Sequence, residues 1–249
     1  MKRILAFISL CLLPSLAAAE CEDISYKSNS YTICRVQIGD DLRLWHSDPG
    51  GALYGGFYSI LDDLKADGQT LGFAMNAGMY HQNRAPVGLF VENGQHQVPL
   101  ADGGNFGNFG LKPNGVFCFD KTRFAVIETR AFDRKKPHCD YATQSGPMLV
   151  IDNKLHHRFL RHSDSRYIRN GVGVRADGQE AVFAISNNPV NFHDFGSLFK
   201  DHLHTPNALY FDGKVSRLFA PDLGRSDSGF ALGVIVGTVI DIDAAGRAD

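Results

Sequence analysis

The sequence predicts an α+β fold, in which one domain is built on a mainly antiparallel mixed sheet with a few covering helices. Short apolar segments rich in β-branched and aromatic residues recur along the chain, and turn residues separate several of them. Only two segments have the spacing of an amphipathic helix. No linker, repeat or low-complexity tract divides the 249 residues, so one core can serve the whole chain.

Residues 1–19 have the pattern of a secretory signal. Lys2 and Arg3 precede a short apolar stretch, and Ala17–Ala19 forms a small-residue cleavage pattern. The stretch is shorter than the roughly 20 residues that a membrane span needs; an uncleaved anchor is the alternative. We therefore expect residues 20–249 to form the mature domain, periplasmic or secreted, with no stable membrane insertion.

The charge balance argues against a nucleic-acid partner. Without Lys2 and Arg3 the chain has 23 basic and 27 acidic residues, a net charge of −4. A protein that binds nucleic acid through its phosphates needs a basic face. A small-molecule or glycan substrate suits this composition better.

Four cysteines remain once Cys11 leaves with the signal, and an even number in an exported chain indicates disulfides. Four cysteines allow three pairings. We favour Cys21–Cys34 with Cys118–Cys139, because each pair closes a local loop. The spacings contain no CxxC pair, which argues against zinc, and we expect neither a metal nor a cofactor.

The first half of the chain is expected to alternate strands with one helix. YTICRV (31–36) and DLRLWH (41–46) are predicted to pair with each other across the turn at residues 39–40. The apolar residues of segment 57–66 recur at i, i+3, i+4 and i+7, which predicts a helix. LGFAM (71–75) has the pattern of a buried strand that breaks into a tight turn.

Hairpins dominate the rest of the prediction. Asn93–Gly94 between VGLFVE and QHQV favours a type I′ turn. Two more strand pairs are expected around residues 120–122 and 177–179. A second helix is predicted over 194–203. The last predicted strands are NALYF, VSRLFA and the apolar run FALGVIVGTVI, which we interpret as a buried strand.

Polar side chains and glycines gather where these strands begin or end. They supply amides, cations, a hydroxyl and a carboxylate, the groups that bind sugar hydroxyls and phosphate. If the strands are neighbours, these groups meet at one rim of the sheet. They are Asn76, Gly78, Lys112, Asn114, Gln144, Ser145, Gly146, Arg166, Arg169, Asn170, Asn187, Asn188, Asn207, Asp212 and Gly213.

The ordered series MNAGMY, PVGLFVENG, LKPNGVF, QSGPMLV, RNGVGV and NALYFDG resembles the phosphodiester glycosidase domain family over residues 70–240, in its bacterial exported branch. That family includes the uncovering enzyme that removes N-acetylglucosamine from a sugar-1-phosphodiester. The family pattern NGGFF matches Asn76 and Gly78, its basic residue ahead of a glycine-containing strand matches Arg169, and its Gln-[Ser/Ala]-Gly-Pro pattern matches residues 144–147. Its Asn-Ala-Leu-x-Leu-Asp-Gly-Gly pattern matches residues 207–214.

One position departs from the family pattern. Lys214 stands where the family has its second glycine. A lysine there adds bulk and charge, so it either clashes with the family's substrate or provides a further partner for phosphate.

The resemblance implies an exported hydrolase that cleaves a glycosyl phosphodiester. Glycosidases usually employ two carboxylates, and Asp212 and Glu92 are the predicted pair; the alternative for Glu92 is a solvated hairpin residue. Arg169 and Lys112 are predicted to pair with phosphate. The predicted partners of the sugar hydroxyls are Asn76, Asn114, Gln144 and Asn207.

Two further expectations concern the geometry of the site and the function of the protein. The Asn76 amide is expected to face a pocket shared with Asp212, Arg169, Gln144 and Asn207. The alternative function is a non-catalytic module that binds an envelope glycan or polysaccharide through the same rim. The two functions differ at Asp212, because an enzyme needs its carboxylate and a binding module tolerates its loss.

Overall fold

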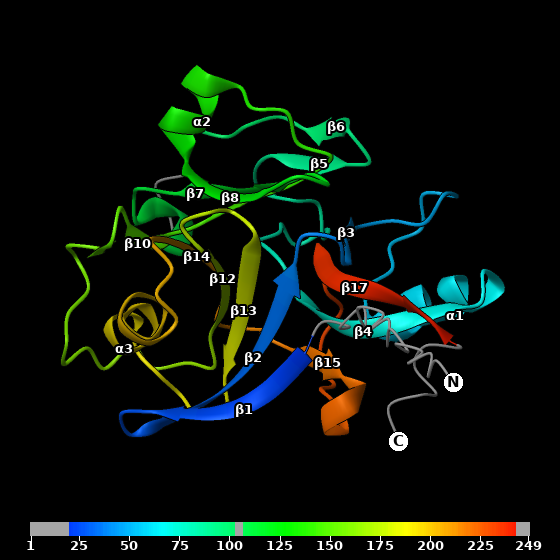
Figure 1. Ribbon diagram of the computed structural model, residues 1–249. Helices are drawn as coiled ribbons and strands as arrows, with labels where there is room; N and C mark the ends of the chain where they lie inside the picture. The colour runs from blue at the N-terminus through cyan, green and yellow to red at the C-terminus, as the bar shows by residue number, and fades with distance from the viewer. Residues whose placement is uncertain (1–19, 103–106, 243–249) are drawn as a thin grey trace, which may run out of the picture.

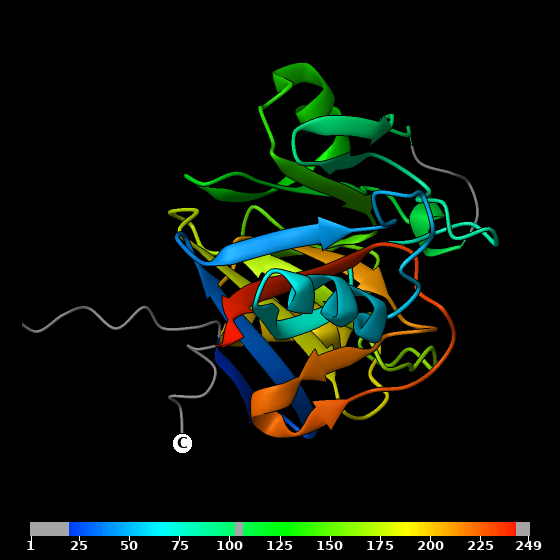
Figure 2. The same ribbon diagram turned by 90° about the vertical axis from the view of Figure 1, so that its right-hand side faces the viewer.

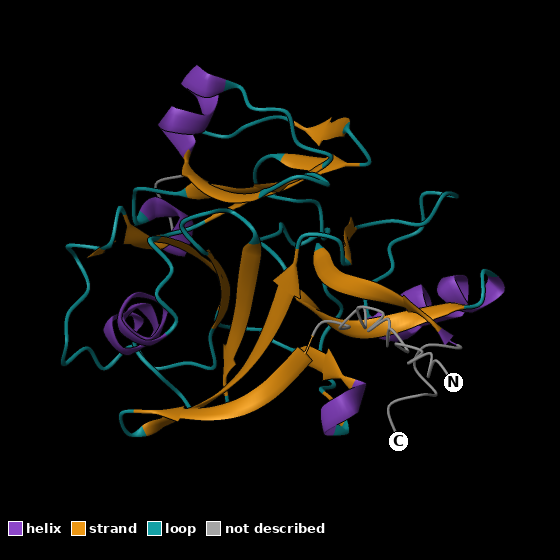
Figure 3. Ribbon diagram, in the orientation of Figure 1, coloured by secondary structure: helices purple, strands orange, loops and turns teal. Residues whose placement is uncertain are grey.

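The computed structural model describes residues 20–102 and 107–242, so the predicted signal lies outside the described residues. The described chain folds into three sheets with short helices at the periphery (Figure 1, Figure 3). All ladders between these strands are antiparallel. The predicted α+β class is confirmed. No helix in the described ranges is long and apolar enough to cross a membrane.

The largest sheet has seven strands. In spatial order they are β1 (Glu20–Tyr26), β2 (Asn29–Gln37), β13 (Glu180–Ser186), β12 (Asn170–Val174), β14 (Asn207–Asp212), β10 (Met148–Ile151) and β11 (Lys154–Leu155).

Each of the other two sheets has five strands. One has the order β16 (Arg225–Ser226), β15 (Leu218–Ala220), β4 (Gln69–Asn76), β17 (Ile235–Asp241) and β3 (Asp41–Trp45). The other has the order β6 (Gln95–Val98), β5 (Phe90–Glu92), β9 (Tyr141–Ser145), β7 (Gly115–Phe119) and β8 (Phe124–Glu128).

The three sheets share one central core. Phe73 on β4, Phe117 on β7 and Phe183 on β13 come from different sheets, and all three are fully buried. The Phe183 ring centroid lies 5.3 Å from that of Phe73 and 5.7 Å from that of Phe117. Aromatic rings bury a large apolar area each, so this contact holds the sheets together where they meet.

The helices cover outer faces of the sheets. α1 (Phe57–Ala66) occupies the predicted range and packs its four buried apolar residues near β4 and β17 (Figure 2). The second predicted helix is α3 (Phe192–Ser197), which continues as the π-helix η2 (Leu198–His202). α2 (Thr129–Lys135) was not predicted, because seven residues are too few to display a helical period. Two short 3-10 turns are η1 (Asn108–Gly110) and η3 (Pro221–Leu223).

One predicted pairing is wrong. β2 lies between β1 and β13, and β3 pairs with β17 in another sheet, so the strands around Gly39–Asp40 do not form a hairpin. Gly39 has φ 110°, and Asp40 accepts a hydrogen bond from the Gln37 backbone N–H at 2.7 Å. This turn moves the chain from one sheet into the next. Strand β1, with the polar sequence ECEDISY, was missing from the prediction.

Both predicted disulfides are present. Cys21–Cys34 joins directly opposed residues of β1 and β2, with the Cα atoms 4.1 Å apart. Cys118–Cys139 ties β7 to the segment before β9, with a Cα separation of 5.5 Å. Stable disulfides are typical of oxidising compartments, which fits a location outside the cytoplasm.

Candidate active site at the edge of two sheets

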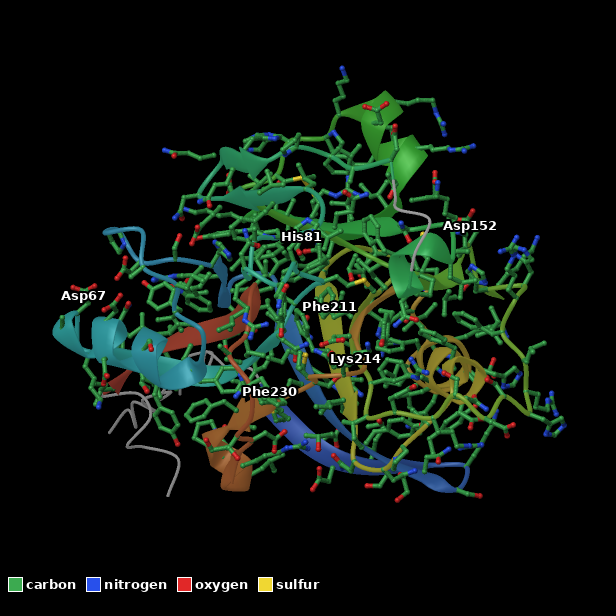
Figure 4. The ribbon with its side chains drawn as sticks, turned by 180° about the vertical axis from the view of Figure 1, so that it is seen from behind. Asp67, His81, Asp152, Phe211, Lys214 and Phe230 are labelled. Carbon is green, nitrogen blue, oxygen red and sulfur yellow. A yellow bond between two sulfur atoms is a disulfide. The ribbon has the colours of Figure 1, made fainter. Side chains whose placement is uncertain are left out.

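The register between β12 and β14 brings two of the predicted motifs together. Asn170 begins β12 and Asp212 ends β14, and the antiparallel ladder places these two residues opposite each other. The Cα register also pairs Leu218, which begins β15, with Met75 near the end of β4. The chain between Asp212 and Leu218 therefore crosses from the seven-stranded sheet to the sheet that contains Asn76. Lys214 marks this crossing on the face seen in Figure 4, close to Phe211.

Two buried asparagines join the sheets at this edge. Asn76 Nδ2 donates to Asn170 Oδ1 at 3.3 Å, and Asn170 Nδ2 donates to the Asn76 carbonyl oxygen at 2.6 Å. Asn76 Oδ1 accepts from the Arg217 backbone N–H at 2.9 Å. Both asparagine side chains are inaccessible to solvent. The expectation that the Asn76 amide faces an open pocket is corrected: the structure uses the amide to connect β4 with β12 and the crossing segment.

The crossing segment is organised by Asp212. Its Oδ1 accepts from the backbone N–H groups of Gly213 at 2.6 Å and Lys214 at 3.1 Å, and its Oδ2 accepts from Val215 at 3.1 Å. Ser216 Oγ lies within hydrogen-bond distance of the Asp212 carbonyl oxygen, at 3.0 Å. A carboxylate has about four acceptor positions. The half-buried carboxylate thus stabilises the turn and retains capacity for one further donor.

Arg169 lies beneath this turn, with its side chain only 1% exposed. Its Nε donates to the Val190 carbonyl oxygen and its Nη2 to the Ser165 carbonyl oxygen, each at 2.9 Å. Its Nη1 lies 3.4 Å from the Tyr210 hydroxyl, and the guanidinium stacks 3.8 Å from the Phe192 ring centroid. Burial lowers the pKa of this arginine.

Glycine is required at Gly213 because the turn packs directly on this arginine layer. A Cβ there would lie 2.3 Å from the Tyr210 hydroxyl and 3.4 Å from Nη1 of Arg169. Any larger side chain would displace the turn that holds the Asp212 carboxylate. Arg169 and Tyr210 therefore act together as the base on which the Asp212 turn rests.

β9 also reaches this edge. Ser145 Oγ donates to the Phe211 carbonyl oxygen at 3.2 Å, next to Asp212. Thr143 Oγ1 donates to the Ala77 carbonyl oxygen at 2.9 Å, and a Cβ at Gly78 would lie 2.9 Å from the same hydroxyl. The predicted Gly78 and Ser145 therefore adjoin the edge from β4 and β9.

Gln144 is on the same strand, but its side-chain amide bonds to the segments that flank β5 and β6. Its Oε1 accepts from the backbone N–H groups of Leu89 at 3.0 Å and Ala101 at 2.9 Å, and its Nε2 donates to the Ala101 carbonyl oxygen at 2.7 Å. The side chain is 2% exposed. These contacts hold the connection around β5 and β6, and they use the groups that were predicted to bind a sugar.

Lys112 and Asn114 line a different groove, beside Thr129 at the start of α2. Asn114 Nδ2 donates to the Phe109 carbonyl oxygen at 2.8 Å. Its Oδ1 would lie 1.9 Å from a Cβ at Gly146. Gly146 is therefore required by the packing of Asn114, and it connects this groove to the edge near Ser145.

Three predicted site residues lie elsewhere. Glu92 faces a groove lined by Arg43 and Trp45, and burial raises the pKa of its carboxyl. Asn207 is at the opposite end of β14 from Asp212, where its Oδ1 accepts from the Asp152 backbone N–H at 3.1 Å. The described contacts join neither residue to Asp212.

Asn187, the third of these residues, lies beside the edge rather than on it. It shares a surface groove with Ser216 and Arg217, and its Oδ1 accepts from Arg225 Nη1 at 2.7 Å.

Ser216 and Arg217 were not predicted as members of this site, and Asn170 was predicted only as a polar residue at a strand end, without a role in binding or catalysis. Arg217 carried a signal, because it is a lone cation in the strand-like run VSRLFA, where apolar residues were expected on the buried face. The described residues contain no group of three or more His, Cys, Asp or Glu side chains placed to hold a metal ion.

Comparison with known proteins identifies the family of the chain. The family model described as phosphodiester glycosidase matches residues 69–228. The protein YigE of Escherichia coli (strain K12) is 33% identical over 222 residues, which cover 88% of this chain and 85% of YigE.

Solved structures show the same fold at low sequence identity. The catalytic domain of zebrafish N-acetylglucosamine-1-phosphodiester alpha-N-acetylglucosaminidase has a TM-score of 0.58 and 14% identity, covering 88% of this chain and 81% of its own. A protein from Burkholderia pseudomallei K96243, described as exported, has a TM-score of 0.55 and 11% identity, covering 84% and 74%. These structures show that the fold is shared, and the match of the family model over more than half of the chain places it in the phosphodiester glycosidase family.

Proposed function

We propose that the protein is an exported hydrolase that cleaves a sugar-1-phosphate diester at the bond between the anomeric carbon and oxygen. The main support for the proposal is the pairing of Asn170 with Asp212. This pairing places the half-buried Asp212 carboxylate at the edge where β4, β9, β12 and β14 meet. Membership of the family and the name of the zebrafish relative support the substrate class. The two disulfides support export.

Asp212 is the proposed base. In hydrolysis the anomeric carbon–oxygen bond breaks, and the oxygen leaves with the electron pair as part of a phosphate monoester. A water oxygen bonds to the anomeric carbon, and the proton that it loses goes to the Asp212 carboxylate. The turn leaves that carboxylate room for one more donor, which is what a water molecule requires.

A phosphate leaving group changes what the rest of the site must do. Phosphate departs as a stable anion, so neutralising its growing charge matters more than donating a proton. A second carboxylate close to Asp212 is therefore not essential, which is consistent with Glu92 lying in another groove. Arg169 contributes by supporting the Asp212 turn through Tyr210 and Gly213; its direct contact with phosphate stays a prediction.

The test is turnover of a panel of sugar-1-phosphodiesters by the purified protein, measured as release of free sugar and of phosphate monoester. Asp212→Asn keeps one oxygen to accept from the Gly213 and Lys214 N–H groups, loses the acceptor for Val215, and cannot take a proton from water. We expect it to lower kcat by about a hundredfold or more.

Asp120→Asn is the matched control. Asp120 Oδ1 also accepts backbone N–H bonds in a tight turn, from Thr122 at 2.7 Å and Arg123 at 3.1 Å, but it belongs to the β7–β8 hairpin. It should retain full turnover. Glycan binding without turnover, equal in the wild type and Asp212→Asn, would overturn the hydrolase proposal and favour a binding module.

A further inference from the structure

A shallow groove of about 630 Å³ adjoins the site at Ser216 and Arg217. It extends from these two residues to Arg225, Asp227 and Asn187. Because Ser216 and the Arg217 backbone also contact Asp212 and Asn76, a molecule bound at the Asp212 turn can extend into this groove.

The charges at the far end of the groove are already balanced. Arg225 Nε lies 3.0 Å from Asp227 Oδ1, and Arg225 Nη2 lies 2.8 Å from Asp227 Oδ2. Arg225 Nη1 donates to Thr32 Oγ1 at 2.8 Å and to Asn187 Oδ1 at 2.7 Å. A bidentate pair of this kind satisfies both ions. Arg225 and Asp227 therefore add no net charge to the groove that a ligand would enter.

Arg217 is different, because its guanidinium forms no salt bridge with any described residue. The residue is 9% exposed, and its buried Nε and Nη2 atoms have no hydrogen-bond acceptor among the described residues. The Phe57 ring centroid lies 5.6 Å from the guanidinium carbon, and the Asp227 carboxylate, which is paired with Arg225, acts on Arg217 only beyond hydrogen-bond distance. A cation–π contact recovers only part of the free energy that burying an ion costs. An arginine stays charged under these conditions.

Gly229 makes the position of this guanidinium possible. A Cβ at Gly229 would lie 3.3 Å from Arg217 Cδ and 3.9 Å from Arg217 Nη1. The loop therefore passes over the arginine stem without side-chain atoms, and Nε and Nη2 remain unpaired beside the groove. An unpaired, pre-positioned guanidinium in the crossing segment that follows Asp212 is suited to an anionic substrate group.

We propose that Arg217 binds the phosphate of the substrate and that the groove toward Arg225 holds the leaving group. The groove has one uncompensated positive charge, and a phosphodiester has one negative charge. When the anomeric bond breaks, the leaving phosphate gains a second negative charge, so its attraction to Arg217 is greater in the transition state than in the bound substrate. This inference rests on the proposed function and names the group that neutralises the leaving phosphate.

Binding is tested without any requirement for turnover. The probe is dimethyl phosphate, a simple phosphodiester, titrated into the protein by calorimetry at constant ionic strength, with neutral methyl glycoside for comparison. Arg217→Met removes the charge and keeps the aliphatic stem. We expect its affinity for dimethyl phosphate to fall about 10- to 100-fold, the equivalent of a lost charged hydrogen bond, and Arg217→Lys to lie between it and the wild type.

Arg43→Met is the matched control, because Arg43 pairs with Asp41 at 2.9 Å in a different groove. It should bind dimethyl phosphate as the wild type does. Thermal unfolding provides a second readout: dimethyl phosphate should raise the Tm of the wild type and of Arg43→Met but not that of Arg217→Met. Equal affinity in the wild type and Arg217→Met would overturn the inference.

Turnover then separates this inference from the proposed function. If a sugar-1-phosphodiester is cleaved, Arg217→Met should lower kcat/KM for it but leave an aryl glycoside without phosphate unaffected. Cleavage that is insensitive to Arg217→Met would overturn the role of Arg217 and leave the hydrolase proposal standing. Loss of dimethyl phosphate binding in Arg217→Met, with no cleavage by any form, would support the anion site and overturn the hydrolase.

Discussion

Arg169 and Arg217 are both buried beside the same turn, yet their surroundings differ in one respect. Arg169 has acceptors for all three nitrogens of its guanidinium group and an aromatic ring beneath it. Arg217 has an aromatic ring but leaves Nε and Nη2 unpaired. Burial lowers the pKa of both groups, so the difference is in hydrogen bonding rather than in desolvation.

The use of its donors separates an arginine that supports the structure from one that can bind a ligand. A buried arginine whose donors are all used stabilises the structure around it, and its removal leaves acceptors without partners. A buried arginine with unused donors costs the folded state free energy, and a ligand recovers that cost. The family pattern pointed to Arg169, whereas the unused donors belong to Arg217.

The largest expected effect is the loss of folding stability in Arg169→Met. Arg169→Met removes the charged hydrogen bonds from Arg169 to the carbonyl oxygens of Val190 and Ser165, and a hydrogen bond to a charged group is worth about 1.5–3 kcal/mol. We expect the free energy of unfolding to fall by about 3 kcal/mol or more, measured by urea denaturation. Arg217→Met should remain within about 1 kcal/mol of the wild type or exceed it. Similar losses in the two variants would contradict the distinction between them.

A smaller loss is expected at the asparagine pair that holds the crossing segment beside Arg217. Asn76→Ala leaves Asn170 Oδ1 without its Asn76 donor and the Arg217 backbone N–H without an acceptor. The expected destabilisation is about 2 kcal/mol. Asn83→Ala is the control, because exposed Asn83 only accepts a local backbone N–H bond from Ala85, and it should cost less than about 1 kcal/mol. An Asn76→Ala protein as stable as Asn83→Ala would show that the pair is dispensable.

The smallest effect concerns Lys214, the exposed residue that replaces a family glycine. Lys214→Gly should change the free energy of unfolding by no more than about 0.5 kcal/mol. If the lysine attracts the substrate phosphate from the surface, the variant should bind dimethyl phosphate a few-fold more weakly at low salt and equally at high salt, because salt screens exposed charges. Calorimetry at two salt concentrations measures this. Tighter binding by Lys214→Gly would indicate instead that the lysine obstructs the site.

Local patterns in the sequence determined the α+β class, the helix over 57–66, the hairpin at Asn93–Gly94 and both disulfides. Each of these depends on residues close in the chain, where side-chain period, turn chemistry and loop length act directly. The ordered motifs also identified the segments that reach the edge.

Only the tertiary structure decided what the polar side chains at those segments contact. Asn76 bonds to Asn170 and Arg217, which lie 94 and 141 positions further along the chain. The Gln144 amide bonds to Leu89, a contact that the motif around Gln144 does not predict. β2 and β3 have the pattern of a hairpin but join different sheets, because alternation specifies which face is buried and not which strand is the neighbour. Arg217 is distinguished from Arg169 by unused donors, and whether a donor is used depends on acceptors that folding brings from distant parts of the chain.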